Sequence, residues 1–365
     1  MSDILPDLQK FINRNVFLRL VSLDSIQGLL TQVNETNRTV LINNENGINV
    51  VGIDEIITFF VITFAYVTDF QLDRISVINL FNNTVTTTIP VMNEPIGIAI
   101  TPNGLSVYVA NSGSSTVSVI NTASNTVVAT IPVGNNPGKI AIASNGTRAY
   151  VTNSSSNTVS IINTLNNTVI GTIPIGASPN NIAITPNGLR LYVTTTSNTV
   201  IVINTSNRTI IATIPVATFL ADIAITPDGT RAYVTNLGSS IVTVINTATN
   251  TVIDTIPVAT PSYSIAITPD GTRAYVGNRG PATPPSATVS VINTTTNTII
   301  DTILLPSQIS AKDIAISPDG FKAYFAFGVG GIGIINTSNN TFNPSSVIST
   351  GGVEIRDIAI TPTIF

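Results

Sequence analysis

Residues 231–236 read Arg-Ala-Tyr-Val-Thr-Asn, or RAYVTN, and this phrase recurs along the chain. The same six letters stand at 148–153, while RAYVGN stands at 273–278 and SVYVAN at 106–111. A second phrase, Ile-Ala-Ile, returns every 41–49 residues and begins at Ile98, Ile140, Ile182, Ile223, Ile265, Ile314 and Ile358. Self-similarity at a nearly constant period of this length indicates a repeat fold.

One repeat, residues 180–216, divides into four short β-branched runs separated by turn residues. The stretch Thr185-Pro-Asn-Gly188 has type I turn chemistry, with proline at the second position and glycine at the fourth. Asn204-Thr-Ser-Asn207 turns the chain again, because Asn tolerates left-handed backbone. Four strands in about 42 residues is the period of a β-propeller blade, and seven copies predict seven blades.

The two ends of the repeat array are complementary. The array begins at Phe64–Thr68, which matches the second strand of a repeat without a first strand before it. It ends at Ile358–Pro362, which matches a first strand without a second strand after it. We therefore predict 1+3 closure, in which the C-terminal strand completes the first blade and removes the exposed edges of an open array.

The alternatives to a propeller are a β-helix and an open stack of hairpins. The coils of a β-helix are much shorter than this repeat, and no helical period of 3.6 residues is found within the repeats. The predicted fold class is therefore all-β, with one closed seven-bladed β-propeller.

The repeat also resembles a known family. Tyr-Val-Thr-Asn at 150–153 and 233–236, within the longer repeat of Ile-Ala-Ile, Pro-Asp-Gly and Val-Ile-Asn-Thr phrases, is similar to the YVTN-type β-propeller repeat. That family occurs in bacterial and archaeal cell-surface and surface-layer proteins. The chain departs from the pattern at Tyr192-Val-Thr-Thr195 and Tyr324-Phe-Ala-Phe327, which weakens the local turn chemistry and not the fold.

Residues 1–60 lie outside the repeat and are expected to form a separate domain before a propeller at 61–365. Several β-rich runs separated by Asp, Asn and Gly turns follow one another there, and Gly28 bends the longest. This order resembles a small Sm-like β-barrel. The phrase from Val51 to Ile56 is similar to one in the short Sm-like domains of endospore coat proteins of Firmicutes.

Composition excludes several classes of function. Charged residues make up 9% of the chain, against about 25% in an average protein, so a disordered, solvated chain is excluded. The net charge is −4 and no basic run is present, so no nucleic-acid partner is expected. The chain has no Cys and no His. We see no secretory signal and no apolar run long enough to insert into a membrane.

The residue before each Ile-Ala-Ile is expected where the inner strand of a blade begins, at the mouth of the central channel. Asp222, Asp313 and Asp357 stand at three of these positions, and their oxygens are candidate ligands for a hard cation such as Ca²⁺. The alternative is that they line a solvated channel, separated by other blades and near Lys139. We predict no metal site and name these three residues as the candidates.

The regular repeat and the absence of His lead us to expect no catalytic residue, no cofactor and no enzymatic activity. With the resemblances above, we predict a non-catalytic, self-associating structural protein of the spore coat, exosporium or cell surface. Its expected partners are itself and other spore- or cell-surface proteins. One alternative is a module that binds a glycan, peptide or cation through the top-face loops and the channel mouth. The other is a metal-dependent lactonase-like hydrolase that uses Asp222, Asp313 and Asp357.

Overall fold

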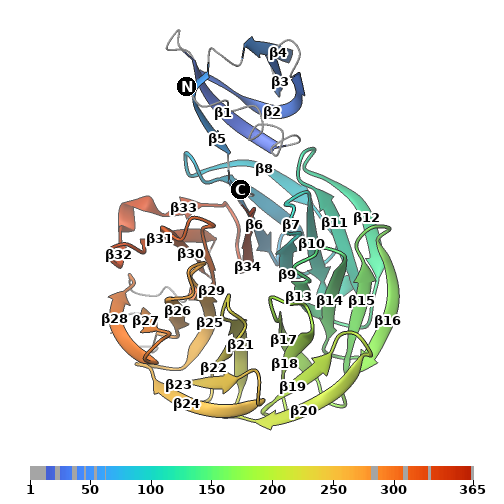
Figure 1. Ribbon diagram of the computed structural model, residues 1–365, viewed down its shortest axis with the longest axis vertical. Helices are drawn as coiled ribbons and strands as arrows, with labels where there is room; N and C mark the ends of the chain where they lie inside the picture. The colour runs from blue at the N-terminus through green and yellow to red at the C-terminus, as the bar shows by residue number, and fades with distance from the viewer. Residues whose placement is uncertain are drawn as a thin grey trace.

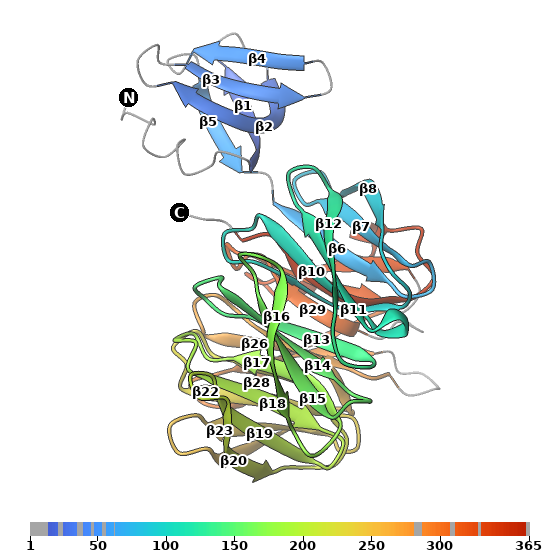
Figure 2. The same ribbon diagram turned by 90° about the vertical axis from the view of Figure 1, so that its right-hand side faces the viewer.

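The structure of the protein is a computed structural model (Figures 1 and 2). It describes residues 14–20, 25–34, 39–44, 47–52, 56–61, 63–280, 287–306, 311–327 and 330–362. Its described elements are strands apart from two short 3₁₀ helices, η2 (Ser112–Ser114) and η3 (Pro344–Ser346). None of the helices described here has the length and apolarity that a membrane span requires.

The first five strands form one antiparallel sheet in the order β4-β3-β2-β1-β5. They are β1 (Arg14–Leu20), β2 (Ser25–Asn34), β3 (Thr39–Asn44), β4 (Gly47–Gly52) and β5 (Ile56–Val61). Val16 of β1 is paired with Gly28 of β2 on one side and with Val61 of β5 on the other. No pairing joins the edge strands β4 and β5 within the described residues, so the sheet is shown and the predicted Sm-like barrel is not.

Seven further sheets surround a central channel and confirm the all-β seven-bladed propeller (Figure 1). Blade 1 contains β34 (Ile355–Ile360), β6 (Phe64–Asp69), β7 (Arg74–Asn79) and β8 (Thr84–Pro90). Blade 2 contains β9 (Pro95–Ile100), β10 (Ser106–Asn111), β11 (Thr116–Asn121) and β12 (Thr126–Pro132). Blade 3 contains β13 (Pro137–Ile142), β14 (Arg148–Asn153), β15 (Thr158–Asn163) and β16 (Thr168–Pro174).

The remaining blades repeat this order. Blade 4 contains β17 (Pro179–Ile184), β18 (Arg190–Thr195), β19 (Thr199–Asn204) and β20 (Thr209–Pro215). Blade 5 contains β21 (Leu220–Ile225), β22 (Arg231–Asn236), β23 (Ile241–Asn246) and β24 (Thr251–Pro257). Blade 6 contains β25 (Ser262–Ile267), β26 (Arg273–Asn278), β27 (Thr288–Asn293) and β28 (Thr298–Leu304). Blade 7 contains β29 (Ala311–Ile316), β30 (Lys322–Phe327), β31 (Gly331–Asn336), β32 (Thr341–Phe342) and β33 (Ile348–Ser349).

Blade 1 is built from both ends of the ring. The C-terminal strand β34 is paired antiparallel with β6, and Ala359 stands opposite Tyr66. The hydroxyl of Thr361 accepts a hydrogen bond from the backbone N–H of Phe64 at 2.8 Å. Residues almost 300 positions apart in the sequence therefore share one sheet, and β6 has no free edge towards the channel.

The repeated tyrosine joins each blade to the next. Tyr233 of blade 5 is fully buried, and its hydroxyl donates to Asn297 Oδ1 of blade 6 at 2.7 Å. Asn297 has a φ of 54°, and an asparagine or arginine with left-handed backbone stands at the matching turn of the other regular blades. The same Tyr-to-Asn bond is made by Tyr66, Tyr108, Tyr192 and Tyr275. This contact explains why both the Tyr and the Asn-Thr phrases recur.

The last two letters of the repeated phrase also have structural roles. Thr235 accepts a hydrogen bond from the backbone N–H of Asp222 at 2.9 Å and so links the two inner strands of its blade. Asn153 donates from Nδ2 to the hydroxyls of Thr158 and Ser160 on the third strand, at 3.1 and 2.9 Å. The RAYVTN phrase is therefore explained by packing within and between blades.

The loop 278–286, which contains the extra residues of the longest repeat, lies mostly outside the described residues. In the Pro-Asp-Gly turns, Asp228 accepts hydrogen bonds from the backbone N–H of Thr230 at 2.9 Å and from the Thr226 hydroxyl. These contacts fit the interpretation of the repeated turn aspartates as turn formers.

Candidate functional site

The mouth of the channel is formed by two positions in each inner strand that break the regular ladder. In β34 the register shifts between Ile355 and Ile358 and in β13 between Pro137 and Ile140, whereas in β29 the shift lies between Ala311 and Asp313. A bulge of this kind turns side chains away from their usual direction. The bulged pairs, in chain order, are Ile96-Gly97, Gly138-Lys139, Asn180-Asn181, Ala221-Asp222, Tyr263-Ser264, Lys312-Asp313 and Arg356-Asp357. The Ile-Ala-Ile phrase that follows them is the same in every blade, whereas these pairs differ from blade to blade.

Lys139 joins two of the three predicted carboxylates. Its ammonium group lies 2.9 Å from Asp357 Oδ2 and 3.7 Å from Asp313 Oδ1. The Lys139 side chain is 23% exposed, whereas those of Asp313 and Asp357 are 10% and 7% exposed. Because an ammonium group has three N–H donors and only Asp357 lies within hydrogen-bond distance, donors remain for a ligand.

Asp222, the third predicted residue, is held by a different set of partners. Its Oδ1 atom accepts from Asn181 Nδ2 at 2.6 Å and from the backbone N–H of Ile223 at 2.7 Å. Its Oδ2 atom accepts the backbone N–H of Ile265 in blade 6 at 2.9 Å. Asp222 is therefore fixed in place by blades 4, 5 and 6.

Asp313 and Asp357 also join neighbouring blades. Asp313 Oδ2 accepts the backbone N–H of Ile358 at 3.0 Å, and Asp357 Oδ2 accepts that of Ile98 at 2.9 Å. In both cases the carboxylate of one blade satisfies a channel-facing N–H of the next. The three aspartates thus close the inner edges of the ring as well as lining its mouth.

Burial and neighbouring charges move the pKa values of this cluster. Burial raises the pKa of Asp222 to about 6, although the Lys139 charge opposes the shift. Burial, and then the negative charge of Asp357, raise the pKa of Asp313 well above its ordinary value. Burial alone would lower the pKa of Lys139, but the charges of Asp313 and Asp357 outweigh it and raise that pKa. Burial thus raises the pKa of both Asp222 and Asp313, while the Lys139 charge opposes the rise at each carboxyl group.

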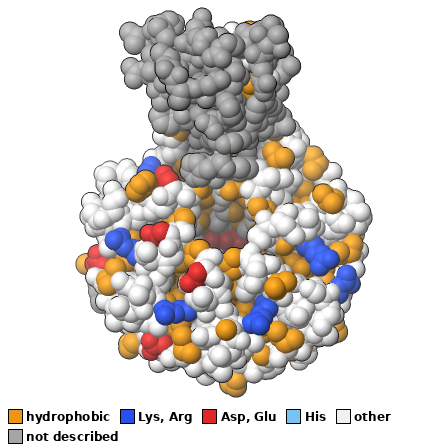
Figure 3. All heavy atoms as spheres, in the orientation of Figure 1, with side chains coloured by type: hydrophobic (Ala, Val, Ile, Leu, Met, Phe, Trp, Pro, Cys, Tyr) orange, Lys and Arg blue, Asp and Glu red, His pale blue; other side chains and the backbone are white. Residues whose placement is uncertain are grey.

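A cavity of about 250 Å³ opens over these residues. Lys139, Asp222 and Asp313 line it together with Lys312 and Arg356 from the neighbouring bulged positions. Figure 3 shows the ring hollowed at its centre, with acidic side chains inside the hollow.

The wall of this cavity contains aromatic and cationic side chains. The Lys312 ammonium lies 4.3 Å from the centre of the Tyr263 ring, and Arg356 lies 4.7 Å from that of Phe70. Arg356 is also paired with Glu354 at 2.5 Å, whereas Lys312 has no acidic partner within the described part of the chain. The cavity therefore has a polar floor and a mixed wall.

The three aspartates do not meet as a metal site. No group of three or more His, Cys, Asp or Glu side chains in the described residues is arranged to hold a metal ion. The Lys139 ammonium already lies between Asp313 and Asp357, and a second cation there would be repelled by it. The arrangement suits proton transfer between side chains better than coordination of Ca²⁺.

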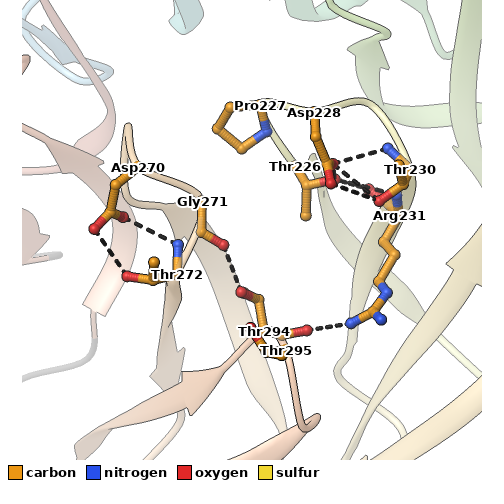
Figure 4. A pocket seen from close by; sticks show the side chains of 10 residues that line it. All are labelled: Thr226, Pro227, Asp228, Thr230, Arg231, Asp270, Gly271, Thr272, Thr294 and Thr295. Carbon is orange, nitrogen blue, oxygen red and sulfur yellow. Dashed lines mark hydrogen bonds between the residues drawn. The ribbon is translucent and has the colours of Figure 1, made fainter.

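The opposite ends of the inner strands form a different kind of pocket (Figure 4). It measures about 350 Å³ and lies between the Pro-Asp-Gly turns of blades 5 and 6. Arg231 there donates from Nη1 to the backbone oxygen of Thr294, and the Asp228 and Asp270 carboxylates are bound within their own turns. A pocket of the same chemistry recurs between blades 6 and 7. The polar groups that line the pocket between blades 5 and 6 are thus already hydrogen-bonded to other residues of the repeat.

Part of the chain matches a known family. Residues 57–169, from β5 to the start of β16, match the model of the family described as "Lactonase, 7-bladed beta-propeller". No curated protein matches the sequence significantly.

Several solved structures share the fold at low identity. A functionally unknown protein from Desulfotomaculum acetoxidans has a TM-score of 0.71 at 20% identity, covering 82% of this chain and 99% of its own. Hydrazine synthase from Kuenenia stuttgartiensis has a TM-score of 0.64 at 21% identity, with coverages of 86% and 92%. The dihydro-heme d1 dehydrogenase NirN has a TM-score of 0.61 at 12% identity, with coverages of 81% and 74%. At these identities the likeness shows the fold alone.

These findings contradict two of our predictions, the non-catalytic structural role and the absence of enzymatic activity. The matched family is one of lactonases, and two of the similar structures are enzymes or parts of enzymes. The findings give no support for a surface-layer, spore-coat or self-assembly role. Our reasoning failed because it treated the repeat as hardly broken and counted the missing His as decisive. The bulged pairs do break the repeat, and burial raises the pKa of two carboxyl groups there, Asp222 and Asp313.

Proposed function

We propose that the protein is a lactonase-like hydrolase whose active site is the cluster at the channel mouth. The observation that supports this most is the Lys139 ammonium, 2.9 Å from Asp357 and beside Asp313 at the floor of an open cavity. The partial match to a lactonase family suggests the reaction class.

The proposed reaction adds water to a lactone and yields a hydroxy acid. Asp222, ionised above pH 6, takes a proton from water as the resulting hydroxide attacks the carbonyl carbon. The free N–H donors of Lys139 stabilise the negative charge on the carbonyl oxygen. When the ring C–O bond breaks, we assign Asp313, whose pKa burial raises, as the general acid that gives a proton to the leaving alkoxide. Solvent then returns the proton from Asp222 to Asp313, so no redox partner is needed.

Two aspartates of blade 7 allow a matched test. Asp313 lies in the channel-mouth cluster, and Asp319 lies in the turn at the other end of the same inner strand, where its Oδ1 accepts the N–H of Phe321 at 3.0 Å. We expect hydrolysis of simple γ- and δ-lactones by the purified protein, measured as hydroxy acid by proton NMR. Asp313→Asn should lower kcat by about 10²-fold or more, because general acid catalysis contributes about 10²–10⁴-fold.

Asp319→Asn is the control and should keep the rate. Activity that survives a metal chelator supports the role of Lys139 as the cation of the site. No hydrolysis of any lactone by the wild type, or equal effects of the two substitutions, would contradict the proposal.

The N-terminal segment is a separate proposal. Its sheet order, β4-β3-β2-β1-β5, and the absence of strand pairing with the ring among the described residues support an Sm-like domain before a propeller domain at 61–365. The pairing of β34 with β6 supports 1+3 closure of that propeller. Localisation at a cell or spore surface and association with other copies stay predictions from the sequence.

A further inference from the structure

Two loop positions beside the channel mouth are joined in the same way in six blades. The residue after the second strand donates its backbone N–H to the carbonyl oxygen of the residue before the inner strand, at 2.7–3.0 Å. The joined pairs, from blade 1 to blade 6, are Phe70 with Glu354, Ser112 with Glu94, Ser154 with Asn136, Thr196 with Ser178, Leu237 with Phe219, and Arg279 with Pro261. Among these described pairs, only that of blade 5 consists of two residues with large apolar side chains and no polar partner.

The apolar pair of blade 5 is continuous with the cavity. Leu237 lines the cavity directly, and so does Ala221, two residues after Phe219. The Phe219 side chain is 72% exposed, an unusual fraction for a phenylalanine. A Cβ atom added at Gly238 would come within 2.6 Å of Phe219 Cδ2, so the ring lies over this glycine, next to Leu237. Ala221, Leu237 and Phe219 form what we call the apolar track.

Phe219 occupies a backbone conformation that phenylalanine disfavours. Its φ is 56°, in the left-handed region, where bulky residues are uncommon and strained. The matching residues Glu94 and Asn136 have φ values of 57° and 53°, so the fold imposes this geometry. The backbone of Phe219 is held on both sides, by Asn198 Oδ1 at 2.9 Å and by the N–H of Leu237 at 2.8 Å. A strained and exposed Phe does not stabilise the folded state through apolar burial, because most of its side chain stays in contact with water.

We propose that the apolar track binds an alkyl substituent of the substrate, so that the enzyme prefers lactones with an extended hydrocarbon chain. This inference rests on the proposed function, which places the lactone ring at Lys139 and Asp313. A chain that leaves the ring towards blade 5 passes Ala221, then Leu237, and ends against the face of Phe219. Each joined pair of the other described blades includes at least one polar residue, and the apolar residues Ile96 and Tyr263 that also line the cavity have no apolar joined pair beside them.

The expected chain-length effect follows from apolar burial. Each fully buried CH₂ group is worth about 0.8 kcal/mol, which corresponds to about a fourfold change in affinity. Because the track is open to solvent on one side, we expect about a twofold gain in kcat/KM per CH₂. From γ-butyrolactone through γ-hexalactone and γ-octalactone to γ-decalactone, kcat/KM of the wild type should therefore rise steadily.

Two substitutions at Phe219 separate binding from folding. Phe219→Ala should flatten the rise over the longer lactones and leave the rate with γ-butyrolactone within about twofold. Phe219→Asn should flatten it equally and raise Tm by about 1–3 °C, because Asn accepts left-handed backbone as it does at Asn136. Phe321→Ala is the matched control, since Phe321 is 62% exposed but lies at the turn end of blade 7. It should keep the full chain-length dependence.

A second readout makes the inference independent of catalysis. Ligand-observed NMR measures binding of γ-decalactone and γ-butyrolactone to wild type, Phe219→Ala and Phe321→Ala. If no lactone is hydrolysed but γ-decalactone binds and Phe219→Ala abolishes binding, the track stands and the hydrolase proposal fails. If lactones are hydrolysed and neither rate nor binding depends on chain length, the track is wrong and the hydrolase proposal stands. An equal loss in Phe219→Ala and Phe321→Ala also overturns the track.

Discussion

The two ends of the inner strands differ in how they use the repeat. At the turn end, Asp228 and Asp270 bind their own turns, and the pockets between blades recur with a similar lining. At the mouth end, the bulged pairs differ in every blade, and Lys139, Asp313 and Asp357 meet across the ring. A repeat protein keeps a residue where each blade needs the same contact. Variation at equivalent positions therefore marks the place where the fold makes no such demand and chemistry can differ.

The pH dependence of stability should have opposite signs at the two ends, and this is the largest difference that we expect. Burial raises the pKa of Asp222 to about 6, so between about pH 4 and 6 the folded protein holds a proton that the unfolded chain has lost. Stability linked to Asp222 therefore falls as the pH rises through this window. Relative to Asp222→Asn, the wild type should lose about 2–3 kcal/mol of unfolding free energy from pH 4 to pH 8.

Asp228 at the turn end provides the opposite case. The Thr226 hydroxyl and the N–H of Thr230 lower the pKa of Asp228, so its contribution is present above the unfolded pKa and is lost on acidification. Urea unfolding of wild type, Asp222→Asn and Asp228→Asn at several pH values measures both slopes. If the two substitutions changed the pH dependence of the unfolding free energy with the same sign, the predicted difference between the two ends would be wrong.

A smaller effect tests the structural reading of the repeated tyrosine. Tyr233→Phe removes the hydroxyl that donates to Asn297 Oδ1 at 2.7 Å and to the Thr294 carbonyl at 3.1 Å. We expect a loss of about 1 kcal/mol of unfolding free energy, since the hydroxyl's hydrogen bond is lost while Arg231 still donates to both acceptors. Tyr324→Phe is the control, because its hydroxyl makes no hydrogen bond within the described residues, and it should cost much less. If urea unfolding showed equal losses of unfolding free energy for Tyr233→Phe and Tyr324→Phe, the proposed inter-blade role of the tyrosine hydroxyl would be contradicted.

The sequence alone predicted the propeller well and its site only in part. Periodicity and turn chemistry determine strand order and blade number, because every blade buries the same residues. Asp222, Asp313 and Asp357 were expected at the channel mouth because each precedes Ile-Ala-Ile; in the structure Asp222 and Asp313 line the cavity, and Asp357 lies beside Lys139, while their role as site residues stays a prediction. Their partners were not foreseen, because the approach of Lys139 to Asp357 depends on how the ring closes.

The role of Phe219 was also missed, for a local reason. Phe219 stands in a loop between blades, where the spacing of residues in the sequence does not predict which way a side chain points. Its left-handed backbone is known only from the structure. A signal was nevertheless available in the sequence. A comparison of each repeat position across the copies shows that the two residues before Ile-Ala-Ile vary, and several of them line the cavity.

The central claim, that the variable mouth is the catalytic end, is tested most directly by two lysine variants. Lys139→Met removes the cation beside Asp313 and Asp357, whereas Lys322→Met removes an exposed lysine at the start of β30, near the turn end. Initial rates of lactone hydrolysis should fall by about 10²-fold or more in Lys139→Met and stay unchanged in Lys322→Met, with both proteins shown to be folded by circular dichroism. A folded Lys139→Met protein with the wild-type rate would contradict the account.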